Sequence, residues 1–422
     1  MSNNKEVNAL APISKDQRES WVSLALVQAG ICVCVPAFLM GALLVEEMNF
    51  GPAIWAGTAG AVLVVAAMII IGFIGCDLGL ATCTITESTF GKKGSRYIAS
   101  TIFMINLIGW FGINNGECAM SFTNFMSECY GIHFPYTASC ILWGIVMTVT
   151  AVFGIKAVEK LDYVSIPVLL IVMIVGTAMA VNLNGLQTVN TPIEPTMTFM
   201  EGVILSFDFF AVGIITSSDF TRFQKSRKDT VLSVTIGVFP LTIITLVIGA
   251  MLTKIANEYD ISMVLIKVGI PLLGVISLIL STWTTNSTNA YTGALNAVKT
   301  FNVPDNRRRE VTLAVGFVGT LLGVTGIVDN LSTFIGFLAY LVCPIGGIML
   351  ADYFILGKGK SENWRSRDGF CISAIIAWAV SAVLSYIIKI DFSSILFAAV
   401  IFIVIERYIP ALARDKQKVE KE

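Results

Sequence analysis

The chain has 422 residues, of which 55% are hydrophobic and only 14% are charged, and its mean hydropathy is +0.78. A soluble globular protein of this length cannot bury so much apolar surface, so the composition excludes that class and indicates a polytopic membrane protein. The formal net charge of −1 excludes nothing further, because in a membrane protein the placement of charge matters more than its sum.

Residues 1–20 are polar and mixed in charge, and we expect them to form a cytoplasmic segment. They lack the pattern of a secretory signal, and the apolar segment that follows is too long for a signal core. The nine cysteines are scattered, without a CxxC motif or the spacing of metal ligands. Such cysteines are typical of small residues packed inside a helical core.

Apolar segments follow one another along the rest of the chain and predict twelve membrane-spanning helices. Their limits are Val22–Val45, Ala53–Cys76, Ile98–Phe122, Thr137–Gly154, Val164–Val181, Gly202–Ser217, Val231–Thr253, Val268–Val298, Val311–Val328, Leu331–Ile355, Phe370–Ile388 and Ile395–Ile405. The last segment is short, so eleven spans is the alternative count.

The positions of the basic residues predict the orientation of these spans. If the N-terminus is cytoplasmic, all but three of the 28 Lys and Arg residues fall on the cytoplasmic side, the exceptions being Lys254, Lys267 and Lys389. Cytoplasmic segments of membrane proteins carry such an excess of positive charge. We therefore expect a multi-pass protein of the plasma (inner) membrane with a cytoplasmic N-terminus and a cytoplasmic tail at residues 410–422.

Two of the predicted spans contain residues that interrupt a helix. The first carries Gly30 and Pro36, and proline has no N–H with which to continue the helical hydrogen bonds. The sixth carries Asp208 and Gly213. These spans occupy corresponding positions if the first ten form two five-helix halves. Broken helices in matching positions of inverted halves point to the central binding site of a secondary transporter.

The eighth span has a polar run at its centre, residues 281–289, which reads STWTTNSTN. At about 100° of rotation per residue, Thr284 and Thr285 lie on one helical face and Asn286 and Asn289 on another. Hydroxyl oxygens suit a small hard cation, and amides suit a planar solute that forms hydrogen bonds. The alternative is that these side chains bond to neighbouring helices, as Ser, Thr and Asn often do in membranes.

The third and sixth spans add aromatic rings and further polar groups. Trp110, Asn114 and Glu117 follow i, i+4, i+7 spacing and share a face of the third span, and the sixth contributes Phe207–Phe210, which reads FDFF. Two rings from different helices can bracket a flat heterocycle while neighbouring amides bind its edge. For each ring taken singly, packing between helices is the alternative.

Two carboxyl groups lie within predicted spans, which makes Glu117 and Asp208 candidate functional residues. Each is a candidate for binding the solute, binding a cation or carrying a coupling proton. The alternative is a structural carboxyl that burial keeps protonated. We expect His133, the only histidine, to be a solvated residue of an external loop.

Five motifs in chain order resemble those of the nucleobase:cation symporter family 1, which includes cytosine permeases and a sodium-coupled hydantoin transporter. They are Gly75-x-x-x-Gly79 with Phe90–Ser95, Trp110–Gly112, Asp219–Phe223, Trp283–Asn286 and Pro344–Tyr353. The resemblance covers most of the chain.

This resemblance implies an all-α fold of LeuT-like type, with ten core helices in two inverted five-helix repeats and two peripheral helices. On this chain the transport core would occupy residues 21–355, with repeats at about 21–182 and 200–355. The peripheral helices would occupy residues 356–409.

Matching positions also imply a binding site. Trp110 and Phe210 would bracket the solute ring, and Asn114 and Asn286 would bind its edge. The implied sodium site consists of five oxygen donors, at Gly30, Val33, Ser281, Thr284 and Thr285.

Three departures from the family motifs widen the expected range of substrates. Leu107 stands where cytosine permeases carry a glutamine, and Glu87 replaces an arginine. Asn289, a further candidate contact, lies one position before the second amide of the hydantoin transporter, where this chain has Ala290. We therefore expect a nucleobase or a related planar heterocycle, such as cytosine, a purine or a hydantoin.

Together these features predict a secondary active transporter, not an enzyme, that imports this solute by sodium symport and alternating access. A proton-coupled transporter that uses Glu117 or Asp208 is one alternative, and a thiamine-precursor pyrimidine or allantoin as substrate is another. A solute sensor without net transport also fits the sequence. Besides the solute, Na⁺ or H⁺ and the lipid bilayer, we expect no cofactor, no nucleic acid and no obligate protein partner.

Overall fold

The structure, a computed structural model, describes residues 11–33, 35–153, 155–257, 261–267, 269–390 and 392–414. Within these residues the chain is helical and has no β-strand, only a single bridge between Glu19 and Gln224, which confirms the all-α prediction. Of the sequence predictions, residues 1–10 of the N-terminal segment, the span limits Gly154 and Val268 and the tail beyond Arg414 lie outside the described residues.

Within the described residues, the first half of the chain begins with a broken helix and continues with four long helices and two short ones. Its helices are α1 (Trp21–Cys32), α2 (Val35–Glu47), α3 (Phe50–Leu78), α4 (Thr82–Ile85), α5 (Glu87–Gly94), α6 (Ser100–Tyr130), α7 (Tyr136–Val152) and α8 (Ile155–Asn184). A π-helical turn, Ser95–Ala99, joins α5 to α6.

The second half begins with a span that is broken twice. Its helices are α9 (Phe199–Phe209), α10 (Ala211–Ile215), α11 (Ser217–Thr221), α12 (Arg227–Gly237), α13 (Phe239–Ala256), α14 (Ile261–Lys267), α15 (Pro271–Phe301), α16 (Arg308–Val324), α17 (Leu331–Leu350), α18 (Ile372–Ile388) and α19 (Ser393–Tyr408). A π-helical segment, Ala351–Leu356, extends α17.

Both predicted helix interruptions are present. α1 ends at Cys32, where Val33 takes φ −104° and ψ 69°, and α2 begins at Val35. Because Pro36 then lies in the first turn of α2, its missing N–H costs no helical hydrogen bond. The sixth span breaks at Phe210, which takes φ −102° and ψ 5°. Backbone groups at such helix ends lack their helical partners and become available to ligands.

Glycines bring α2 against α13. A Cβ atom on Gly41 would overlap the carbonyl oxygen of Leu246, and one on Gly249 would overlap that of Phe38. The two helices therefore cross backbone to backbone, as small residues allow in membrane proteins. This contact packs the second piece of the first span against the second half of the chain.

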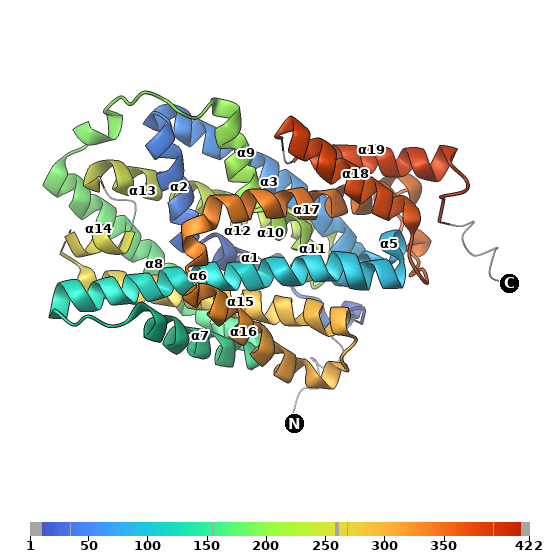
Figure 1. Ribbon diagram of the computed structural model, residues 1–422, viewed down its shortest axis with the longest axis horizontal. Helices are drawn as coiled ribbons and strands as arrows, with labels where there is room; N and C mark the ends of the chain where they lie inside the picture. The colour runs from blue at the N-terminus through green and yellow to red at the C-terminus, as the bar shows by residue number, and fades with distance from the viewer. Residues whose placement is uncertain are drawn as a thin grey trace.

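The long axis of the molecule is set by α6 and α15, which run side by side and form its most extensive helix contact (Figure 1). α7 and α16 pack against this pair, and α3 packs against α9 and α11. α18 and α19 pack on α17 at the edge of the bundle, where the sequence predicts two peripheral helices. The inverted repeats and the domain limits stay predictions.

Five helical stretches among the described residues are long and apolar enough to cross a membrane. They are Phe50–Leu78, Glu87–Tyr130, Tyr163–Asn184, Arg227–Ala256 and Thr333–Leu356. The broken first and sixth spans consist of shorter pieces, and the polar run of α15 lowers its hydropathy. The count of twelve spans therefore stays a prediction.

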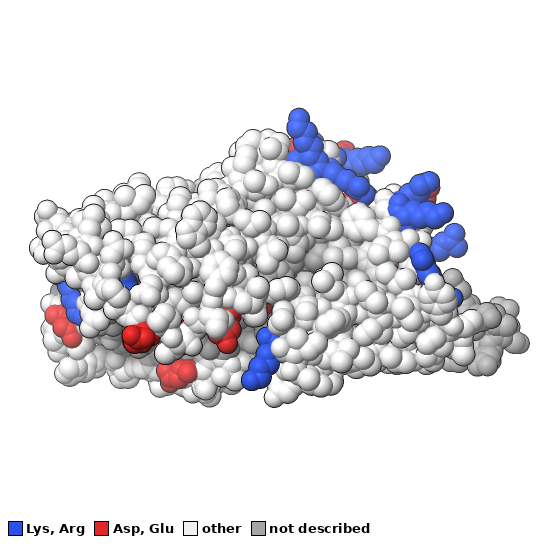
Figure 2. Space-filling view, turned by 90° about the horizontal axis from the view of Figure 1, so that it is seen from above, with Lys and Arg blue, Asp and Glu red and all other residues white. Residues whose placement is uncertain are grey.

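Positive charge gathers toward one end of the long axis, beside a broad uncharged surface (Figure 2). We call this the basic end. Hydrogen bonds and ion pairs join its segments: Lys92 pairs with Asp368 (2.8 Å), Lys299 pairs with Glu87 (2.7 Å), and Arg96 donates to the carbonyl of Thr300 (2.9 Å). α6 begins and α15 ends at the basic end.

Candidate binding site

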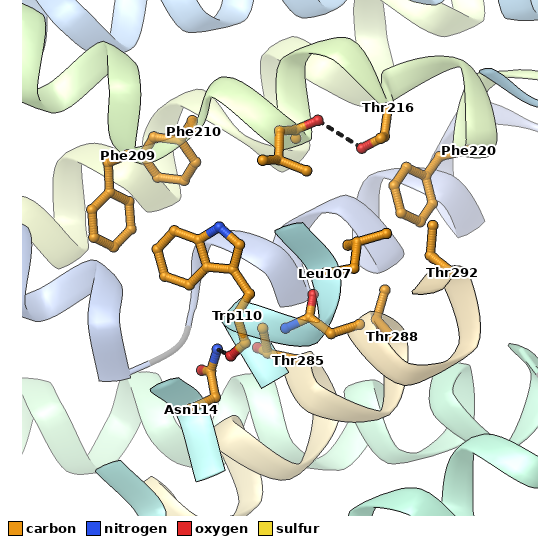
Figure 3. Close-up of a pocket in the computed structure, with 13 residues that line it drawn as sticks. Leu107, Trp110, Asn114, Phe209, Phe210, Thr216, Phe220, Thr285, Thr288 and Thr292 are labelled. Carbon is orange, nitrogen blue, oxygen red and sulfur yellow. Dashed lines mark hydrogen bonds between the residues drawn. The ribbon is translucent and has the colours of Figure 1, made fainter. Parts of the chain in front are cut away.

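A cavity lies where the broken sixth span faces α6 and α15 (Figure 3). Its lining residues are Leu107, Trp110 and Asn114 from α6, Phe209, Phe210, Val212, Gly213, Thr216 and Phe220 from α9–α11, and Thr285, Thr288, Asn289 and Thr292 from α15. The structure thus brings four of the predicted substrate contacts to one cavity, namely Trp110, Asn114, Phe210 and Asn289.

The aromatic wall of the cavity is built of rings in edge-to-face contact. Trp110 lies 5.4 Å from Phe209 and 6.1 Å from Phe334 between ring centroids, with interplanar angles of 66° and 81°. Phe209 in turn lies 5.3 Å from Phe210. Edge-to-face pairs are favourable and fix ring orientation, and they leave a face of the indole free of parallel stacking. Trp110 is therefore held in place beside the cavity.

Asn114 offers an open acceptor to the cavity. Its Nδ2 donates to the carbonyl of Trp110 at 2.8 Å, which fixes the side chain against its own helix. Its Oδ1 is buried and has no hydrogen-bond partner among the described residues. A buried amide oxygen of this kind is costly unless a ligand donates to it.

The two amides in the polar run of α15 differ in their surroundings. Asn289 lines the cavity and donates through Nδ2 to Oδ1 of Asn286 at 3.3 Å. Asn286 is fully buried behind it, and its Nδ2 donates to the carbonyl of Phe111 at 2.9 Å. Asn286 thus joins α15 to α6 and orients Asn289, and its direct contact with a solute stays a prediction.

Both predicted coupling carboxyls lie outside the cavity lining. Glu117 is 5% exposed and follows Trp110 by seven residues on α6. Asp208 is 6% exposed and precedes Phe209 in α9. Their roles in solute, cation or proton binding stay predictions.

Oxygen atoms from α15 and the end of α1 converge beside the cavity. Oγ1 of Thr285 is placed to donate to the carbonyl oxygen of Gly30 at 3.2 Å and to that of Ser281, one turn back on its own helix, at 3.1 Å. Oγ1 of Thr284 lies 2.8 Å from the same Ser281 carbonyl. Val33 lies at the break that ends α1.

This donor set fits a small hard cation, because it consists of neutral hydroxyl and carbonyl oxygens from two elements. Among the described residues no group of three or more His, Cys, Asp or Glu side chains is arranged to hold a metal ion. Cation binding at this cluster stays a prediction.

Sequence reasoning missed several lining residues, among them Phe209, Thr216 and Phe220. The aromatic density of the FDFF run contained a signal for Phe209. Phe220 lies in the Asp219–Phe223 motif, to which the sequence assigned no contact. Thr216, whose Oγ1 donates to the carbonyl of Val212 at 2.7 Å, had no signal. The chain breaks at Phe210 and again at Thr216, so helical periodicity does not extend through this region.

Long apolar helices, two broken spans and a cavity beside an oxygen cluster are features of secondary transporters of the membrane. A family model described as "Permease for cytosine/purines, uracil, thiamine, allantoin" matches residues 12–405. The chain belongs to this permease family, which confirms the family resemblance and the prediction that it is a transporter and not an enzyme.

Curated relatives share this classification at low identity. The chain is 23% identical to the cytosine permease of Escherichia coli K12 over 88% of this chain and 86% of that protein. It is 22% identical to a purine-uracil permease of Arabidopsis thaliana, over 87% of this chain and 69% of that protein. It is 21% identical to the hydantoin permease of Microbacterium maritypicum, over 92% of this chain and 85% of that protein.

Solved structures confirm the overall fold. Mhp1, a nucleobase-cation-symport-1 family transporter in a closed conformation with bromovinylhydantoin bound, superposes with a TM-score of 0.84 at 19% identity over 98% of both chains. A Na⁺-coupled sialic acid symporter gives 0.63 at 10% identity over 95% of this chain and 91% of that one. The chain therefore has the helical fold of LeuT-like transporters.

Proposed function

We propose that the protein imports a nucleobase or a related planar nitrogenous heterocycle by symport with sodium. The observation that carries the sodium assignment is the approach of Thr285 Oγ1 to the carbonyl oxygens of Gly30 and Ser281. Thr285 also lines the cavity, so a cation bound there would adjoin the solute. Adjacent ligands that stabilise one conformation raise each other's affinity by the same factor.

The solute assignment rests on the chemistry of the cavity wall. Trp110 and Phe210 provide rings for a flat heterocycle, and Asn114 Oδ1 accepts a hydrogen bond from a ring N–H. Asn289 supplies a second amide from the opposite helix. The names of the relatives, which are permeases for cytosine, purine and uracil, and hydantoin, support this class of substrate.

The orientation follows from the placement of charge. Because Lys and Arg concentrate at cytoplasmic segments, we place the basic end on the cytoplasmic side of the plasma (inner) membrane. Solute would then enter the cavity from the opposite end, and the two halves would rock about the broken spans to release it inward.

A thermal-shift screen of the purified protein tests both parts of this proposal. Cytosine, uracil, hypoxanthine, hydantoin, allantoin and thiamine would each be added in sodium or in choline at equal ionic strength. We expect at least one heterocycle to raise the Tm, and to raise it more in sodium, because ligands that bind only the folded state stabilise it. An equal shift in choline would remove sodium from the proposal, and no shift with any compound would remove the substrate class.

Net transport needs a separate measurement, because a sensor would also pass the thermal-shift screen. We expect purified protein in proteoliposomes to take up the stabilising heterocycle against its gradient when sodium is imposed outside. Binding without uptake or counterflow would identify a sensor instead.

Proton coupling is the second candidate, since Glu117 and Asp208 are buried within spans. We expect that sodium alone drives uptake. In that case the Glu117→Gln protein should keep its sodium-driven uptake in proteoliposomes, and a pH gradient should not drive uptake by it. Loss of pH-driven uptake with retention of solute exchange would instead assign the coupling proton to Glu117. Asp208→Asn, measured in parallel, applies the same criterion to the other carboxyl.

A further inference from the structure

Two buried asparagines on α6 and α15 carry amide atoms that have no hydrogen-bond partner among the described residues. Asn106 is fully buried, and neither its Oδ1 nor its Nδ2 is bonded. Asn296 is 2% exposed; its Nδ2 donates to the carbonyl of Thr292 at 3.0 Å, but its Oδ1 has no donor. Burial of unbonded amide groups in a membrane protein is costly, so these positions call for a functional explanation.

The register of the two antiparallel helices places both asparagines between the cavity and the basic end. Two hydrogen bonds set this register: Asn286 Nδ2 donates to the carbonyl of Phe111 (2.9 Å), and Arg96 Nε donates to the carbonyl of Thr300 (2.9 Å). Between them, Gly293 lies against the side chain of Leu107. Asn106 is therefore about level with Thr292. Asn296 lies about one turn nearer the basic end.

Helical spacing relates the same residues to the cavity lining. Asn296 follows Asn289 by seven residues and Thr292 by four, so it continues the lining face of α15. Asn106 precedes Trp110 by four residues on α6. Thr292 lies with Phe220 at one end of the cavity, opposite Phe209 and Phe210 (Figure 3). The polar faces thus extend past this end of the cavity.

An ion pair lies beyond the two asparagines. Nζ of Lys299, three residues after Asn296, lies 2.7 Å from Oε1 of Glu87 and also donates to the carbonyl of Cys83. This contact joins α15 to the segment between α3 and α6. Along the helix axes, the asparagines therefore lie between the cavity and this ion pair.

We propose that Asn106 and Asn296 form a second, transit site that binds the planar solute after it leaves the cavity and before its release at the basic end. This inference rests on the proposed function, because a heterocycle with ring N–H and C=O groups is the solute that amides recognise. Asn106 offers a donor and an acceptor, and Asn296 offers an acceptor. A solute in transit would complete the hydrogen bonds that the protein leaves open.

Leucine substitutions test this site, because leucine has a similar volume and cannot form hydrogen bonds. Asn106→Leu and Asn296→Leu would be compared with the unmutated protein in two assays, equilibrium binding to purified protein and counterflow in proteoliposomes, with radiolabelled cytosine, uracil and hydantoin as probes. We expect counterflow to slow by about tenfold, as the loss of one hydrogen bond in the limiting step would cause, with unchanged dissociation constants. Asn106→Ser, which keeps a hydroxyl, should recover part of the rate.

Asn115→Leu is the matched control. Asn115 is a buried α6 asparagine whose Oδ1 also lacks a partner, but its Nδ2 donates to the carbonyl of Cys140 in α7, away from the cavity. Its counterflow per folded protein should match that of the unmutated protein. Unchanged counterflow in both test variants, or a parallel loss of affinity and rate, would overturn the transit site while leaving the proposed function intact. If the unmutated protein binds and exchanges none of the probes, the proposed function fails first and the transit site with it.

Discussion

Replacing Trp110 by alanine should weaken binding of the heterocycle by roughly 5- to 150-fold, because stacking of a base on an aromatic side chain is worth about 1–3 kcal/mol. Edge-to-face contacts with Phe209 and Phe334 hold the indole in place beside the cavity. Because the ring is already ordered before the solute binds, binding loses little side-chain entropy at Trp110. Isothermal titration of the purified protein with the heterocycle that gives the largest thermal shift would measure the change.

Two further variants separate stacking from packing. Trp143→Ala removes an indole of the same size from α7, where it makes an edge contact with Phe122 at 5.6 Å outside the cavity lining, and should leave affinity unchanged. Trp110→Phe keeps a ring and should recover most of the affinity. If Trp110→Ala binds as tightly as the unmutated protein, Trp110 serves packing alone.

Thr285→Val should abolish the sodium dependence of solute binding. Valine keeps the shape of threonine but removes the oxygen that lies near the carbonyls of Gly30 and Ser281, so the cation loses one donor and its neighbours change little. Coupling between two ligands is typically about 1–3 kcal/mol, or roughly 5- to 150-fold in affinity. Titrations of solute at low and high sodium, with choline holding the ionic strength constant, would measure this factor.

Matched variants make this result specific to the oxygen. Thr285→Ser restores the hydroxyl and should restore the dependence on sodium. Thr282→Val removes a buried hydroxyl of the same helix that donates only to the carbonyls of Leu278 and Ile279, and should leave the dependence unchanged. A Thr285→Val protein that keeps the full sodium effect would assign Thr285 to helix packing.

Much of the cavity could be predicted because its helices are regular. The i, i+4 spacing of Trp110 and Asn114 on α6 places both on one face, and both line the cavity. The same regularity sets Thr285 one turn beyond Ser281 on α15. Pro36, together with the composition of the first span, indicated the break that brings Gly30 to Thr285.

Helical spacing shows which residues share a face of a helix but not what that face contacts. The roles of Asn286, Asn289 and Glu117 depend on those contacts. Asn286 and Asn289 share a face of α15, yet one bonds to the backbone of α6 and only the other reaches the cavity. Glu117 shares a face with Trp110 but lies two turns away, outside the lining. These differences depend on neighbouring helices that are distant in the sequence.

The sequence by itself determined that this protein is a helical membrane protein, that its first and sixth spans are interrupted, and the family to which it belongs. Those properties depend on hydrophobicity, proline chemistry and local motifs, all of which act over short stretches of chain. Only the tertiary structure decided that Phe209, Thr216 and Phe220 line the cavity and that Asp208 does not. The chain breaks at Phe210 and Thr216 reset the helical phase, so the direction of each side chain beyond them is set by how α10 and α11 pack against α3 and α17.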